Sequence, residues 1–167
     1  MIDPAYVATM ARYNAWQNRS LIAAADGLDD AARRLDRGAF FQSIHGTFSH
    51  LLWADEMWLS RLIGSPKPGI PGRDSASYVT DWDEFRQRRI EIDETFIGLG
   101  NKISASELAG DITWLSGLAG KEVTRPRGLI VAHVFNHQTH HRGQIHAMLT
   151  SAGAKPDDTD LMLVFER

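Results

Sequence analysis

Four long segments of this 167-residue chain place apolar side chains three, four or seven residues apart, and glycine or proline breaks separate them. That spacing is typical of helices that bury one face. The segments run from Asp3 to about Ala25, from about Phe41 to Leu62, from about Thr80 or Asp81 to Gly98 or Gly100, and from Pro126 or Arg127 to about Ser151. They predict one all-α domain, residues 1–167, folded as a four-helix bundle.

The breaks between these segments predict the connections. The Pro- and Gly-rich stretch 64–72 indicates a long loop between the second and third helices, and it lacks the Lys-Ser/Thr ending of a phosphate-binding loop. Two short stretches, 111–115 and 122–124, favour a small hairpin before the fourth helix. The apolar residues 161–165 are expected to pack back onto the bundle.

Composition excludes several classes of protein and of site. The chain has no cysteine, so disulfides, thiolate metal ligands and a cysteine nucleophile are ruled out. A net charge of −3 without a basic cluster argues against a nucleic-acid partner. No segment approaches the ~18 uninterrupted apolar residues of a membrane span. The start of the sequence lacks a secretory signal, so a cytoplasmic location is expected.

Histidines form the most informative pattern, since five of the seven lie in the fourth segment. His137 and His141 are four residues apart and fall on the apolar stripe of that segment, so both rings can reach one metal ion. A third ligand must come from another helix. The second segment offers His45 and His50, and the mid-helix position of His50 beside aromatic residues favours it. The pattern therefore predicts a divalent transition metal on His50, His137 and His141.

Other interpretations of the histidines stay open at this stage. His133 is four residues before His137 and is an alternative ligand. A pair four residues apart also arises by chance. In that case these histidines would be core residues hydrogen-bonded to Tyr13, Asn14 or Asp55, or they would lie on a solvated polar face, without any metal.

The fourth segment resembles a known family. The stretch 133–145, HVFNHQTHHRGQI, is similar to the His-x3-His-Arg-Gly-Gln segment of the DinB/YfiT-like family of small metalloproteins. Stretches 50–59 and 13–18 are similar to that family's second- and first-helix patterns. The resemblance implies a four-helix bundle, a metal triad of His50, His137 and His141, zinc or nickel as the metal, and a homodimer. It also implies reactions of low-molecular-weight thiols or of thiol-linked substrates.

Three neutral imidazoles leave a coordination position open, which is typical of catalytic zinc. We therefore expect a metal-dependent transferase or hydrolase that acts on a small thiol-linked or electrophilic substrate. Any reacting thiol must come from outside, since the chain has no cysteine. One alternative is a non-catalytic, metal-binding stress-response protein in which the metal stabilises the bundle. Another is a helical interaction module without a metal.

Four residues are candidates for the surroundings of the metal or for a pocket: Asp55, Tyr13, Asn14 and Gln144. For Asp55 the favoured alternative is a surface ion pair with Arg61 or Arg142, and Arg142 itself is expected at the surface. Gly143 destabilises a helix by ~1 kcal/mol relative to alanine. Close approach of another helix or of a ligand would explain a glycine at that position.

Overall fold

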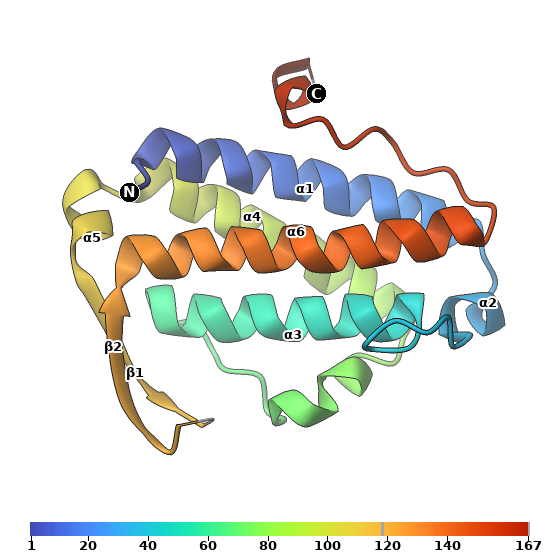
Figure 1. Ribbon diagram of the computed structural model, residues 1–167, viewed down its shortest axis with the longest axis horizontal. Helices are drawn as coiled ribbons and strands as arrows, with labels where there is room; N and C mark the ends of the chain where they lie inside the picture. Colours follow the sequence, from blue (N-terminus) through green and yellow to red (C-terminus); the bar gives the residue numbers. More distant parts are fainter. Residues whose placement is uncertain (118, 167) are drawn as a thin grey trace.

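The computed structural model describes residues 1–117 and 119–166, and it confirms the prediction of an all-α bundle with one small hairpin. The long helices are α1 (Pro4–Asp26), α3 (Ile44–Ile63), α4 (Trp82–Lys102) and α6 (Arg127–Ser151). Helices α1 and α6 run in one direction, and α3 and α4 run in the other (Figure 1). Each of them packs mainly against two others, so α1 lies diagonally opposite α3.

Short elements fill the connections between the long helices. They are α2 (Asp30–Arg34), the 3-10 helix η1 (Gly72–Ser77), α5 (Ala105–Ala109), strands β1 (Asp111–Ser116) and β2 (Lys121–Pro126), and the 3-10 helix η2 (Leu161–Glu166). The antiparallel hairpin of β1 and β2 confirms the prediction for this stretch. Helices α2, η1 and α5 are too short for the periodicity of the sequence to indicate them.

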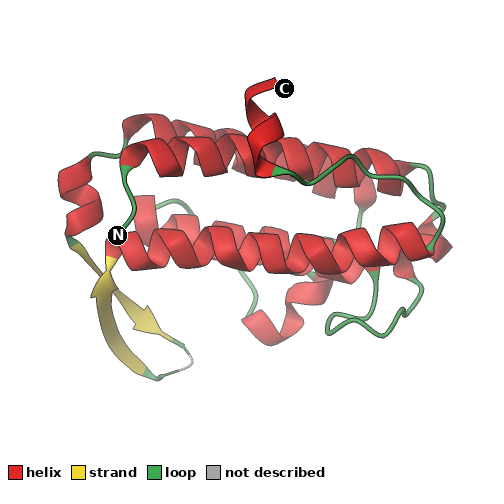
Figure 2. Ribbon diagram, turned by 45° about the horizontal axis from the view of Figure 1, so that its top comes forward, coloured by secondary structure: helices red, strands yellow, loops and turns green. Residues whose placement is uncertain are grey.

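The C-terminal segment turns back after α6 and runs over α1 and α6 to η2 (Figure 2). Val164 is buried against the core, whereas Met162 and Phe165 are 74% and 72% exposed. The expectation that the apolar residues 161–165 pack onto the bundle is therefore met by only part of the segment. Within the described residues, no helix is both long enough and apolar enough to cross a membrane.

Polar side chains cap three of the long helices. The side chains of Asp3, Ser43 and Asp81 each accept a hydrogen bond from an amide in the first turn of the helix that follows. The cap at Ser43 sets the start of α3 at Ile44. The helix thus begins three residues later than the predicted start at Phe41, and this places Phe41 in the preceding turn.

The prediction that the third long helix ends at Gly98 or Gly100 is wrong, because α4 continues to Lys102. A Cβ atom added at Gly100 would lie 2.9 Å from the Cα atom of Ala8 in α1. Real Cβ atoms do not approach other atoms so closely. Gly100 therefore allows two helices to pack closely, which sequence periodicity does not distinguish from a helix end.

The core consists of two apolar clusters separated by a polar layer. One cluster contains Val7, Phe96 and Phe135, and the other contains Leu21 and Ile145. Six buried polar side chains, contributed by all four long helices, lie between the two clusters, and we call them the polar layer. They are Asn14 and Asn18 of α1, Asp55 of α3, Arg89 and Asp93 of α4, and Gln138 of α6. This layer joins all four helices at mid-length.

Ion pairs and amides hold the polar layer together. The Arg89 guanidinium lies 2.6 Å from an Asp55 oxygen and 2.9 Å from an Asp93 oxygen. The Gln138 side chain donates to Asp55 at 2.9 Å and accepts a hydrogen bond from Asn14. Because Gln138 follows His137 directly, these bonds also fix the rotation of α6 and with it the face on which His137 lies.

The layer corrects the expectation that Asp55 is a surface carboxylate. Asp55 is completely buried, and burial raises the pKa of its carboxyl group while Arg89 opposes that rise. Neither predicted partner forms a surface ion pair with it. Arg61 lies over the rings of Trp58 and Trp114, and Arg142 is itself buried, with 5% of its surface exposed.

Candidate metal centre

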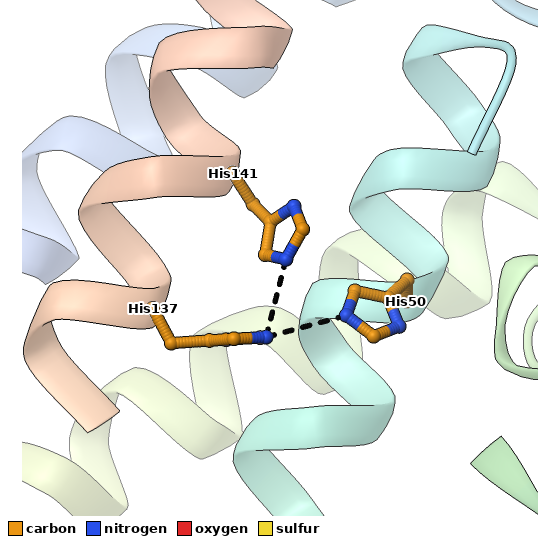
Figure 3. A group of neighbouring side chains, drawn as sticks. All are labelled: His50, His137 and His141. Atoms are coloured by element: carbon orange, nitrogen blue, oxygen red, sulfur yellow. Dashed lines mark hydrogen bonds between the residues drawn. The ribbon is translucent and has the colours of Figure 1, made fainter. Parts of the chain in front are cut away.

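Helices α3 and α6 are antiparallel neighbours, and together they place three imidazoles at one point. His50 projects from α3, and His137 and His141 project one turn apart from α6 (Figure 3). The Nε2 atom of His137 lies 3.4 Å from that of His50 and 3.1 Å from that of His141. The three possible ligand atoms all lie within 4.8 Å of one another.

The partners of the other ring nitrogens indicate where the protons lie. The Ser75 hydroxyl donates to the carbonyl oxygen of Gly72 at 2.6 Å, so its oxygen accepts from Nδ1–H of His50 at 2.8 Å. The Nδ1–H group of His141 donates to Oε1 of Gln144, also at 2.8 Å. With the proton on Nδ1, each neutral ring has a free lone pair on Nε2.

Burial keeps these rings neutral. It lowers the pKa of His50 to about 3 and that of His137 to about 4, and the charges of the neighbouring imidazoles add to the effect. Burial also lowers the pKa of His141. Because a histidine must be deprotonated to ligate a metal, this environment prepares all three rings for binding near neutral pH.

The donor set fits a divalent transition metal. At least two Nε2 lone pairs point into one small space, and the Nδ1 atom of His137 is buried without a hydrogen-bond partner among the described residues. If His137 carries its proton on Nε2, it can donate to only one of the two other rings at a time. A cation would satisfy all three nitrogens together, and imidazole is a common ligand of zinc, nickel and copper.

Aromatic rings cover one side of the three histidines. Phe41 stacks on His50 with centroids 3.8 Å apart, and its centroid lies 5.5 Å from that of His141. The tight turn 39–42, in which Gln42 has a left-handed φ of 65°, presents Phe41 to the site. Trp53 lies parallel to His50 at 6.3 Å. These apolar rings offer no ligand atom, and no other histidine or carboxylate of the described residues joins the group.

The remaining histidines of the two segments lie outside this group. His45 is buried, and its Nε2 atom lies 2.8 Å from the carbonyl oxygen of Val79. His133 packs edge-on against Trp58. In the structure His50, and not His45, lies beside His137 and His141.

Of the four predicted neighbours of the site, only Gln144 touches one of the three histidines. Asp55 and Asn14 belong to the polar layer and reach α6 through Gln138. Tyr13 lies elsewhere, where its hydroxyl donates to the carbonyl oxygen of Thr159 at 2.7 Å. These three residues share helix faces with the core, which is why sequence position alone did not separate them from the site.

Sequence reasoning missed Ser75 and Phe41. Ser75 reaches His50 only because the chain after α3 forms η1 and folds against that helix. No motif in the Pro- and Gly-rich connection indicates this contact. Phe41 was assigned to the helix itself, and the Ser43 cap that places it in a turn was the signal that would have found it.

Replacing Ser75 by alanine is expected to weaken metal binding by about 10- to 100-fold, the usual effect of losing a group that orients a metal-ligating histidine. Competition with a chromogenic chelator would measure the affinity for zinc. Ser77→Ala is the matched control, because Ser77 makes the same kind of bond within η1, to Asp74, and is exposed. Equal affinities for the two variants would show that the Ser75 hydroxyl does not orient His50.

Comparisons with known proteins identify a family and a similar fold. The family model described as "DinB family" matches residues 1–166. A crystal structure of a DinB-like protein from Bacillus cereus is similar in fold, with a TM-score of 0.52 and 16% sequence identity, over 86% of this chain and 90% of that chain. At this identity the likeness concerns the fold alone. The comparison with curated proteins finds no match.

Proposed function

We propose that this chain, which belongs to the DinB family, binds a divalent transition metal through His50, His137 and His141. The observation that carries the proposal is the convergence of three Nε2 atoms within 4.8 Å, with the Nδ1 atoms of two rings already hydrogen-bonded. Zinc and nickel are the metals proposed, since both accept imidazole nitrogen.

The proposed activity is that of a metal-dependent transferase or hydrolase acting on a small thiol-linked or electrophilic substrate. Three protein ligands leave a position for water or substrate, as in catalytic zinc sites. When bound, the metal would supply Lewis acidity to a thiol or water in that position. In a transfer reaction the thiol loses its proton to solvent, its sulfur bonds to the electrophilic carbon, and the leaving group departs with its electron pair.

The chain's own residues shape this reaction. Phe41 and Trp53 flank the histidines and would exclude bulk water from the reacting atoms. The nearest carboxylates of α3 are engaged elsewhere: Asp55 pairs with Arg89, and Glu56 pairs with Arg88 at 2.8 Å. Deprotonation of a substrate thiol would therefore depend on the metal and not on a carboxylate base from this part of α3.

The partners are part of the same proposal. A low-molecular-weight thiol would be the co-substrate, and a second copy of the chain would form a homodimer, with the cytoplasm as the compartment that supplies both reduced thiol and metal.

One observation favours a different role. The three histidines come from two helices, so a bound metal would link α3 to α6 and could serve stability alone.

Cobalt(II) distinguishes the two roles, because its absorption reports on what occupies the open position. We expect 2-mercaptoethanol to add a sulfur-to-cobalt charge-transfer band to the loaded wild-type protein, and we expect no such band with His137→Ala. The zinc- or nickel-loaded protein should also speed the displacement of chloride from 1-chloro-2,4-dinitrobenzene by a thiol. If the metal raises the melting temperature but no thiol changes the cobalt spectrum and no substrate of a thiol and electrophile panel is turned over, the enzymatic role is wrong.

A further inference from the structure

A cavity of about 370 Å³ lies on the other side of α6 from the three histidines, between α1, α6 and the C-terminal segment. Its lining includes Tyr13, Leu21, Arg142, Gly143 and Thr159. The volume falls within the range of ~300–1,000 Å³ typical of small-molecule sites. The lining combines the Tyr13 ring and the apolar side chain of Leu21 with polar groups, which is the usual composition of such a site.

Arg142 belongs to the lining of this cavity and is only partly hydrogen-bonded. The residue is 5% exposed, and its Nη1 atom is buried without a hydrogen-bond partner among the described residues. Its Nη2 atom donates to the Thr139 hydroxyl at 3.3 Å. Asp55 and Asp93 both pair with Arg89, and neither lies within ion-pairing distance of Arg142. A buried guanidinium with one unpaired nitrogen and no ion-pair partner is incompletely compensated, and an anionic ligand would improve that compensation.

Gly143 points to the same conclusion. A Cβ atom added at Gly143 would have no neighbour within 4 Å, so no helix approaches closely there. The glycine also has a helical φ, so alanine would be better for the helix by ~1 kcal/mol. Gly143 is exposed and belongs to the lining of the cavity, so a side chain at this position would extend into the open space there. A requirement for that space explains why the position carries no side chain.

The C-terminal segment borders the cavity, and its bonds to α1 do not involve Arg142, which contacts the Thr139 hydroxyl and the Tyr13 ring. Tyr13 donates to the carbonyl oxygen of Thr159, and Gln17 donates to that of Asp158 at 2.9 Å. Both donors are thereby used to hold the segment in place. The guanidinium remains the cationic group in the cavity wall, while the Tyr13 ring and Leu21 line the rest.

We propose that this cavity, which we call the Arg142 cavity, binds a small organic anion whose carboxylate pairs with Arg142 and whose apolar body lies against Tyr13 and Leu21. The planar donors of arginine match a carboxylate. The inference holds whether or not the three histidines bind a metal, because it concerns the opposite face of α6.

Calorimetric titration with benzoate, and with benzamide as its neutral counterpart, tests the proposal. We expect benzoate to bind saturably and benzamide to bind at least about tenfold more weakly, since a hydrogen bond to a charged group is worth that much. Gly143→Leu should fill the cavity and weaken benzoate binding at least about tenfold while leaving helix content unchanged, because leucine favours a helix. Gly98→Leu is the matched control, since Gly98 is also helical with open space around it but lines a different cavity.

The His137→Ala variant separates this cavity from the three histidines, because a carboxylate can also bind to a metal held there. Benzoate binding that survives His137→Ala and is lost in Gly143→Leu supports the Arg142 cavity. Equal affinities for benzoate and benzamide, full binding by Gly143→Leu, loss of binding in His137→Ala, or no binding at millimolar benzoate would each overturn the proposal.

Discussion

Mass spectrometry of purified His137→Ala protein is expected to find no stoichiometric transition metal, whereas the wild-type protein should carry about one equivalent, as a three-histidine site does. His137 is the central residue of the group, because its Nε2 atom lies within 3.4 Å of both other Nε2 atoms. Its removal leaves two ligands on different helices. The loss of affinity should exceed the roughly 100-fold upper limit that is typical of losing only an orienting group.

His140→Ala is the matched control for this experiment. His140 occupies the same helix and is exposed, and its ring contacts that of His141, but it contributes no atom to the group of three. The control protein should keep its metal. Wild-type protein that stays free of metal after incubation with zinc, nickel, copper and cobalt would show that these histidines are not a metal site.

Replacing Asp55 by alanine is expected to lower the free energy of unfolding by about 3–5 kcal/mol, the range seen when one partner of a buried ion pair is removed. The substitution leaves the fully buried Arg89 with Asp93 alone, and Gln138 loses its acceptor. Such a loss is a large part of the ~5–15 kcal/mol that stabilises a typical domain. Urea denaturation of metal-free protein would measure it without a contribution from the metal.

An exposed ion pair provides the comparison. Asp83 pairs with Arg86 at 3.0 Å, and the Asp83 side chain is 83% exposed. Asp83→Ala should therefore cost only about 0–1 kcal/mol. If Asp55→Ala were as mild as Asp83→Ala, the polar layer would contribute little to stability, and its ion pairs would be no stronger than those at the surface.

The sequence predicted those features that repeat along a helix. Apolar spacing located the four long helices, and the helical face shared by His137 and His141 identified two of the three grouped histidines. What it did not predict depends on contacts between distant segments. Asp55 was assigned to the surface because its partner Arg89 lies 34 residues away on another helix.

Glycine was the other source of error, because its role depends on what lies next to it. Gly100 was interpreted as a helix end, yet it allows α1 and α4 to pack closely. At Gly143 the sequence left two explanations open, close approach of a helix or of a ligand, and the empty space beside it excludes the first. Ser75 carries no pattern of its own, so only the folded chain places it beside His50.

The polar layer also determines how the helices align along their length. Two apolar faces can slide past each other by one turn, about 5.4 Å, and still bury their side chains. The same slip of α3 would carry Asp55 away from Arg89 and leave a guanidinium facing methyl groups. Buried polar pairs are best known for selecting one register in this way. Because His50 shares α3 with Asp55, and His137 precedes Gln138, that register sets the separation of the imidazoles before any metal arrives.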